Sequence, residues 1–188
     1  MNGVLGWDIG GVNTKVARVA GARVLAAHAA PYELQRDPAA LAPLLAHLAR
    51  DLGAGAADPH GVTMTAELSQ LFRTKREGVA FVLDAVAAAF PDACVRVWSV
   101  DARWRTPAQA RREPLAVAAA NWAATAHVVG RLCTDCLLVD VGSTTTDIIR
   151  REKSNGISST LLYLSSDNSR CSSWCCRTAR SRTFFRPV

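Results

Sequence analysis

A short motif occurs twice in this chain and constrains the fold more than any other feature of the sequence. The first copy, residues 6–15, reads GWDIGGVNTK, and the second, residues 138–148, reads LVDVGSTTTDI. In each copy a short apolar run, typical of a buried strand, leads to an Asp, one apolar residue, a Gly and then small polar residues. Glycine lets backbone N–H groups approach an anion, and an Asp at a strand end can hold Mg²⁺ beside phosphate oxygens. Two such turns facing each other would form a clamp for a phosphate group.

The residues after the first motif predict strands instead of a helix. Residues 15–19 and 23–28 alternate in hydropathy, with Gly21 at the turn between them. A dinucleotide-binding fingerprint or a P-loop needs a helix directly after its glycines. The strand meander therefore disfavours both of these nucleotide sites.

Helices and strands alternate after this meander. We expect helices at 37–52, 77–90 and 114–132, a helical approach at 107–112, and strands at 61–66, 95–100 and 137–141. Together with a first strand at 4–9, the order is β-β-β-α-β-α-β-α-β. This order predicts an α/β sheet with helices packed on it.

The composition is that of a globular protein, and much of its excess basic charge lies near the C-terminus. The chain has 188 residues, of which 49% are hydrophobic, and a net charge of +6. Much of this charge is carried by residues 150–188, and no aromatic-and-basic module accompanies it, so we expect no nucleic-acid partner. No apolar stretch is long enough to cross a bilayer, and no cationic segment precedes an apolar one at the N-terminus. We therefore expect no membrane association and a cytoplasmic location.

Cys133 and Cys136 have the spacing of half a zinc site. No second His or Cys pair follows at a suitable spacing before residue 150, and Cys136 begins the apolar run of a strand. We therefore interpret the two cysteines as small buried residues beside a strand.

Several stretches, taken in order, resemble a known family. Besides the first motif they are VTMTAELS at 62–69 with FRTKREG at 72–78, AANWAATA at 119–126, and the second motif. Together they resemble the hydantoinase A/oxoprolinase group of the actin/Hsp70/sugar-kinase superfamily. Within that group they are similar to hydantoinase-like proteins of tetrahydromethanopterin-linked C1 metabolism, which resemble methanofuran-precursor synthases. The resemblance implies an α/β actin-like ATPase (ribonuclease H-like) fold, with a first lobe of mixed sheet and packed helices and an incomplete second lobe.

The resemblance also implies an activity. Family members would bind a phosphate or pyrophosphate group with Mg²⁺ and catalyse group transfer in cofactor biosynthesis, by a condensation that displaces pyrophosphate. The partner is then a phosphorylated small molecule, either ATP or a pyrophosphate-bearing substrate. Two alternatives stay open: an ATP-dependent amidohydrolase or sugar-kinase-like phosphotransferase, and a non-catalytic pseudoenzyme or assembly partner. The substrate and the oligomeric state do not follow from the sequence.

The resemblance assigns roles to named residues. Asp8 and Asp140 are the expected catalytic and metal-binding carboxylates. Phosphate oxygens would be bound by Gly10, Gly11, Asn13, Thr14, Lys15, Gly142, Ser143, Thr144, Thr145 and Thr146. A charge-rich loop with Glu67, Arg73 and Lys75 would border the cleft and meet an anionic substrate. Each role has a plainer alternative: a turn-capping Asp, a solvated Lys, a β-rich threonine edge and a solvated loop.

Composition and family pattern change at the same place. After residue 149 alanine nearly disappears, Ser, Arg and Cys dominate, and the family resemblance stops. We therefore divide the chain into a hydantoinase-like region, 1–149, with both phosphate loops, and a tail, 150–188, in which only 156–164 has the pattern of a strand. A disordered tail and a loss of the native reading frame near Arg150 both account for the change, and the coincidence of the two breaks favours the second.

Overall fold

The structure of this chain is a computed structural model, which describes residues 3–133, 135–141 and 145–151 and three two-residue strands beyond them. These short strands are β9 (Leu164–Ser165), β10 (Arg177–Thr178) and β11 (Ser181–Arg182). The strand expected at 156–164 lies outside the described residues, apart from its last residue.

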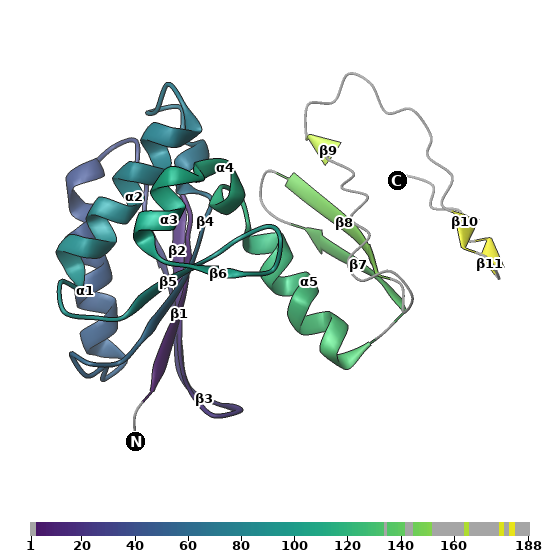
Figure 1. The fold of residues 1–188 in the computed structure, drawn as a ribbon, viewed down its shortest axis with the longest axis horizontal. Coiled ribbons are helices and arrows are strands. Elements are labelled where there is room, and N and C mark those ends of the chain that lie inside the picture. Colours follow the sequence, from purple (N-terminus) through teal and green to yellow (C-terminus); the bar gives the residue numbers. More distant parts are fainter. Residues whose placement is uncertain are drawn as a thin grey trace.

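A six-stranded mixed sheet forms the body of the molecule (Figure 1). Its strands are β1 (Val4–Ile9), β2 (Asn13–Ala20), β3 (Arg23–Pro31), β4 (His60–Met64), β5 (Val95–Trp98) and β6 (Trp104–Arg105), in the spatial order β3-β2-β1-β4-β5-β6. Strands β1, β2 and β3 form an antiparallel meander, whereas β4 and β5 run parallel to β1. The expected meander and the expected α/β sheet with packed helices are thereby confirmed.

Alternation along β1 decides which face of the sheet is covered. Leu5, Trp7 and Ile9 are buried on one face, whereas the intervening residues are exposed or half-buried on the other. The tight turn between β2 and β3 is possible because Gly21 adopts a φ of +59°, in the left-handed region that glycine favours.

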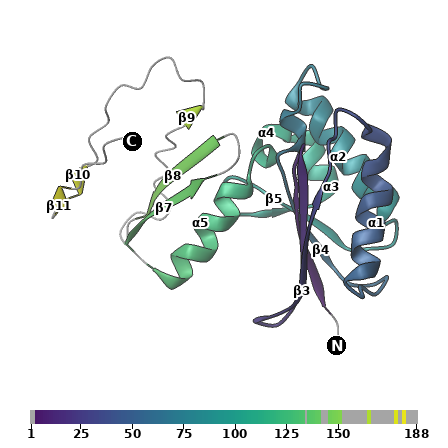
Figure 2. The same cartoon turned by 180° about the vertical axis from the view of Figure 1, so that it is seen from behind.

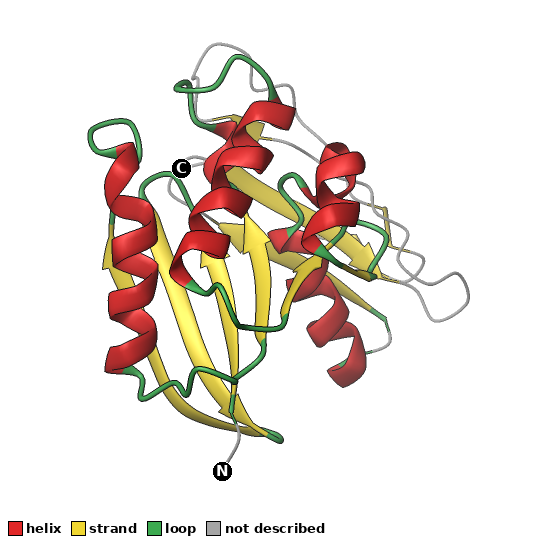
Figure 3. Cartoon of the chain, turned by 60° about the vertical axis from the view of Figure 1, so that its left-hand side comes forward, coloured by secondary structure: helices red, strands yellow, loops and turns green. Residues whose placement is uncertain are grey.

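Helices cover the two faces of the sheet unequally. The helical segments are η1 (Pro38–Ala40), α1 (Leu41–Asp51), η2 (Ala66–Leu68), α2 (Lys75–Ala89), α3 (Pro107–Arg112), α4 (Pro114–Val117) and α5 (Asn121–Leu132). Figures 1 and 3 show α1, α2, α3 and α4 on one face and α5 on the opposite face. The main core lies on the first face, where buried leucines and valines of α1 and α2 pack against the sheet, among them Leu41, Leu45, Val79 and Val82.

The single helix expected at 114–132 is wrong. Two helices, α4 and α5, replace it, and the break lies at Ala118, which is extended with a ψ of 132°, and Ala119, which has a φ of +48°. Two contacts account for the break, because Ala118 forms an isolated bridge with Met64 and the N–H of Ala119 binds a buried carboxylate. The high helix propensity of alanine is overridden here by these tertiary contacts.

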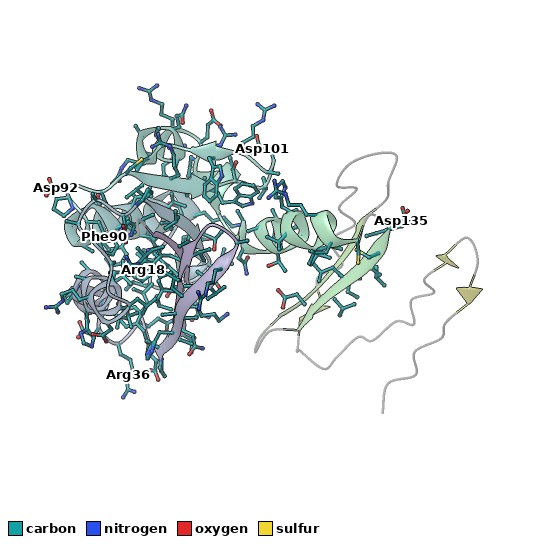
Figure 4. The ribbon with its side chains drawn as sticks, turned by 90° about the horizontal axis from the view of Figure 1, so that it is seen from below. Arg18, Arg36, Phe90, Asp92, Asp101 and Asp135 are labelled. Atoms are coloured by element: carbon teal, nitrogen blue, oxygen red, sulfur yellow. The ribbon has the colours of Figure 1, made fainter. Side chains whose placement is uncertain are left out.

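A buried ion pair fixes the start of β1. Figure 4 places Arg18 among the side chains of the main body, and its Nη2 lies 3.0 Å from Oδ2 of Asp58. The Asp58 carboxylate also accepts hydrogen bonds from the N–H groups of Gly3 and Gly55, at 3.2 and 3.1 Å. Burial alone would raise the pKa of Asp58, but these backbone N–H groups and the guanidinium together lower it.

The second motif belongs to a separate small sheet. Strands β7 (Cys136–Val141) and β8 (Thr145–Arg151) pair antiparallel, and β9 joins β8. Figures 1 and 2 show α5 between this pair and the six-stranded sheet. Cys133 is exposed and Cys136 is half-buried, so the prediction that both cysteines are buried is wrong. Within the described part of the chain, no three His, Cys, Asp or Glu side chains gather as metal ligands would, and no helix is both long and apolar enough to span a membrane.

Candidate functional site

The first motif forms a tight, well-anchored turn between β1 and β2. The N–H of Gly10 donates to the carbonyl of Asn13 at 3.0 Å, and the carbonyls of Gly11 and Val12 accept from Leu34 and Tyr32. A Cβ on Gly10 would lie 2.6 Å from the Asn13 oxygen, so only glycine fits this position. The turn is therefore held through its carbonyl groups.

Two other N–H groups of this turn make no backbone hydrogen bond in the part of the chain that the structure describes. Within the described residues, neither Gly11 nor Val12 donates a backbone hydrogen bond. Gly11 is half-buried and Val12 is exposed. Two consecutive free N–H groups are the kind of backbone arrangement that binds an anion.

Asp8 and Lys15 face each other across β1 and β2 beside this turn. They are paired in the antiparallel register, and Nζ of Lys15 lies 3.2 Å from Oδ2 of Asp8. The second carboxylate oxygen, Oδ1, is buried and has no hydrogen-bond partner among the described residues. Since a buried oxygen without a partner carries a desolvation cost, Asp8 is equipped to accept a further donor or a cation.

The remaining two predicted residues of this turn differ in exposure. Asn13 is exposed at the start of β2, where its amide is accessible to a ligand. Thr14 is fully buried, and its Oγ1 has no hydrogen-bond partner. Thr14 therefore contributes a second buried, unpartnered oxygen close to the turn.

Glu67, named from the sequence as part of a charge-rich loop, is buried in the structure. It lies in η2, directly after β4, and only 2% of its surface is exposed. Oε1 accepts the N–H of Ala119 at 2.7 Å, and Oε2 is buried without a partner. Burial raises the pKa of Glu67 to about 7, against the opposing effects of backbone hydrogen bonds and of the charge of Lys75. The negative charge of Asp8 adds a still smaller increase.

Helix α2 packs directly on Glu67. A Cβ on Gly78 of α2 would lie 2.6 Å from the Cα of Glu67 and 2.7 Å from its carbonyl oxygen. Only glycine permits this approach of a helix to the η2 backbone. Gly78 and Ala119 thus hold the carboxylate from two sides.

The other charged residues of the loop do not share this burial. Arg73 and Lys75 are exposed, and the N–H of Arg73 donates to Oε2 of Glu77 at 3.0 Å. Thr74 caps α2 by accepting the N–H of Glu77 at 3.2 Å. The loop is therefore partly a helix-capping device, and its reach toward a substrate remains a prediction.

The second motif is only partly described. Gly142, Ser143 and Thr144 lie outside the described residues, and nothing is described of the side chains of Thr145, Thr146 and Asp147. Asp140 is half-buried on β7, in register with Asp147 on β8. No hydrogen bond or ion pair joins the side chain of Asp140 to the first motif among the residues the structure describes. The facing clamp of two turns stays a prediction.

A cavity of about 1020 Å³ lies along the open face of the sheet, beside α5. Asp8, Lys15 and Thr63 line it together with small residues of β1, β2 and β3. The cavity is also lined by Trp98, Trp104 and His127. The ring of Trp98 packs edge-on against the other two rings, with centroid distances of 4.8 Å to Trp104 and 5.2 Å to His127. The polar pair beside the first motif therefore opens onto a mainly apolar space.

The sequence did not identify Gly78, Ala119 or the aromatic residues that line this cavity as parts of the site. A glycine inside an amphipathic helix pattern is the one signal that points to the first of these, because it marks a close backbone approach. A left-handed alanine has no signature in the sequence, since alanine favours helices in every local scale.

Comparison with known proteins places this chain among relatives. The family model for hydantoinase/oxoprolinase matches residues 58–160, more than half of the chain and past residue 149. The (4-{4-[2-(gamma-L-glutamylamino)ethyl]phenoxymethyl}furan-2-yl)methanamine synthase of Methanocaldococcus jannaschii is 38% identical over 147 residues. That match covers 78% of this chain and 42% of the relative, so the chain spans less than half of the relative's length.

Two solved structures are similar in outline. A Ppx/GppA family member from Aquifex aeolicus has a TM-score of 0.45 and 13% identity, covering 87% of this chain and 51% of that chain. A putative 2-dehydro-3-deoxygalactonokinase from Sinorhizobium meliloti has a TM-score of 0.45 and 11% identity, covering 86% of this chain and 52% of that chain.

Proposed function

Because this chain belongs to the hydantoinase/oxoprolinase family, we propose that it carries the phosphate-binding part of a group-transferring enzyme of methanofuran-linked cofactor biosynthesis. The M. jannaschii synthase supports this choice, since its name describes a phenoxymethyl-furan ether. In the proposed reaction the phenol oxygen of an acceptor bonds to the methylene carbon of a furan unit. Pyrophosphate leaves with the bonding electrons, and the phenol loses its proton. This chain spans 42% of that relative, so we assign to it the phosphate site and not the whole activity.

The observation that carries the proposal is the unpartnered Oδ1 of Asp8 beside two free N–H groups. The buried carboxylate oxygen lacks a donor and is suited to bind a metal ion. The two N–H groups lack acceptors and are suited to bind phosphate oxygens. A metal–phosphate ligand would satisfy both. The donor set also fits Mg²⁺, which takes oxygen ligands and uses one or two carboxylates beside phosphates and water.

Each residue of the turn has a separate task in this proposal. The N–H groups of Gly11 and Val12 would bind phosphate oxygens, and Lys15 would neutralise part of their charge as a point charge. Asp8 would hold Mg²⁺, which when bound supplies Lewis-acid stabilisation of the leaving group. Lys15 would then exchange its contact with Asp8 for one with the phosphate, because both partners compete for the same ammonium group.

Lysine protection tests the proposal on the chain as it stands. We expect pyrophosphate with MgCl₂ to slow reductive methylation of Lys15, measured by mass spectrometry, while Lys153 of the same chain reacts at an unchanged rate. Asp8→Asn should abolish the Mg²⁺ dependence of this protection. Equal rates for Lys15 with and without pyrophosphate would refute phosphate binding at the first motif.

The family name itself favours a second candidate, an ATP-dependent amidohydrolase. The two reactions differ in what is consumed and released. A full-length relative that releases pyrophosphate without ATP supports the transferase. ATP consumption that depends on a cyclic amide supports the hydrolase.

A further inference from the structure

Buried side-chain oxygens without a hydrogen-bond partner gather in one corner of this molecule. Within the described part of the chain there are three of them: Oδ1 of Asp8, Oγ1 of Thr14 and Oε2 of Glu67. The other unpartnered buried atoms are nitrogens of Arg18, Trp98 and Arg105. Native proteins leave few such oxygens unsatisfied, so the two carboxylate oxygens, of Asp8 and Glu67, need an explanation.

The sheet brings these three residues to the same end of neighbouring strands. Ile9, which follows Asp8, is paired with Thr14 of β2 and with Met64 of β4. The N–H of Thr65 then binds the carbonyl of Ile9 at 2.9 Å, and η2 with Glu67 starts at the next residue. Asp8 lies near the end of β1 and Glu67 follows β4, the adjacent parallel strand, so both carboxylates belong to the same edge of the sheet.

Glu67 is held in place by backbone groups. Oε1 is fixed by the N–H of Ala119, and Gly78 leaves no room for the η2 backbone to move toward α2. The left-handed φ of +48° at Ala119 is strained for a residue other than glycine, and the surrounding structure maintains it. The second oxygen of the carboxylate held by this segment, Oε2, has no partner among the described residues.

We propose that Asp8 and Glu67 together hold one hydrated divalent cation, Mg²⁺ or Mn²⁺, each carboxylate contributing its unpartnered oxygen directly or through a water. The inference rests on the proposed function and deepens it, because it gives the phosphate site a second carboxylate, on η2. Two carboxylates are enough, since Mg²⁺ keeps several waters and completes its shell with phosphate oxygens.

Electrostatics supports a cation in this corner. Lys15 contacts only Oδ2 of Asp8, and its side chain is 63% exposed, so it compensates the Asp8 charge weakly. The two carboxylates belong to the same edge of the sheet, where their negative charges repel each other. A shared divalent cation would relieve this repulsion and satisfy both unpartnered oxygens at once.

Paramagnetic broadening of amide resonances locates the cation without an activity assay. In the full chain titrated with MnCl₂, we expect the N–H of Ala119 and of Gly10 to broaden first, because they flank the two carboxylates. Glu67→Gln keeps an acceptor for Ala119 but removes the charge, and it should weaken Mn²⁺ binding about tenfold or more. Asp8→Asn should have a similar effect, and Glu33→Gln, at an exposed carboxylate that pairs with Arg36, should have none.

The outcomes separate this inference from the proposed function. Mn²⁺ affinity unchanged by Glu67→Gln, in a variant whose amide spectrum is otherwise native, overturns the inference. Broadening centred away from η2 overturns it too, and Asp8→Asn keeps the test decisive if Glu67→Gln does not fold. If pyrophosphate protects Lys15 but Mn²⁺ binding does not depend on Glu67, the proposed function is supported and the inference is overturned. Glu67-dependent Mn²⁺ binding without any pyrophosphate effect leaves only the cation site.

Discussion

Replacing Glu67 by Gln should stabilise the fold at alkaline pH. The folded state raises the pKa of this carboxyl from 4.5 to about 7, first through burial. Between these two values the folded state binds more protons than the unfolded state, so stability contributed by the carboxyl is present below pH 4.5 and is lost as the pH rises to about 7. At about 1.4 kcal/mol per pH unit, the ionised Glu67 costs about 3 kcal/mol at pH 8.

Gln removes this cost and retains the acceptor for the N–H of Ala119. Glu67→Gln should therefore match the parent chain at pH 4.5 and exceed its free energy of unfolding at pH 8 by about 3 kcal/mol. With a urea m-value of about 2 kcal/mol/M, the unfolding midpoint at pH 8 should rise by about 1.5 M. Urea titrations followed by tryptophan fluorescence at both pH values measure this difference.

The sign of the pH dependence is the critical result. The argument that the buried charge is uncompensated would be refuted by a variant that is less stable than the parent at pH 8. It would also be refuted if the unfolding midpoint of the variant differed from that of the parent by the same amount at both pH values. MgCl₂ provides an internal check on the cation proposed for this corner. It should raise the stability of the parent chain at pH 8 more than that of Glu67→Gln.

Three further predictions concern other parts of the fold. Asp58→Asn leaves a guanidinium buried without its partner and should cost about 3 kcal/mol in urea unfolding at pH 7. The loss should shrink as the pH falls below 3.8, the ordinary pKa of the carboxyl, because the lowered pKa makes the parent lose this stability in acid too. Gly78→Ala forces α2 away from η2 and should lower the free energy of unfolding by at least about 2 kcal/mol. Gly6→Ala is the control, because its nearest contact is at 4.0 Å, and it should change the melting temperature little. Equal decreases in melting temperature for the two variants would contradict the close approach. Burial lowers the pKa of His60, whose Nδ1 accepts the indole N–H of Trp7 at 3.0 Å, so its contribution to stability is present above pH 6.5 and is lost as the pH falls below that value. His60→Gln should flatten that decline in a series of thermal melts between pH 5 and 7, and an unchanged slope would exclude His60 as its source.

Local patterns predicted most of the first sheet. The meander around Gly21 and the strand ending at Asp8 follow from period-two alternation and one glycine, and both need only neighbouring residues. The Asp8–Lys15 pair was predicted as separate residues of one motif, and their contact follows from the strand register that the turn sets.

Long-range contacts explain what the sequence did not predict. Glu67 looks like any charged residue in a polar loop, and its burial depends on Gly78 and Ala119, which are 11 and 52 residues away. The break of the alanine-rich helix has the same origin, because a buried carboxylate captures an N–H that a continuous helix would use. Propensity and periodicity describe neighbours along the chain and contain no information about such partners.

The segment between α4 and α5 has a practical meaning for anyone who modifies this chain. Loops between helices are normally the places where an inserted tag or a new chain end is tolerated. Ala118 and Ala120 are buried here, Ala118 is bridged to β4, and the N–H of Ala119 is bound to Glu67. The backbone is therefore fixed at the point where it crosses from one face of the sheet to the other. The exposed turn at Gly21 is the better site for an affinity tag, a fluorophore or a circular permutation.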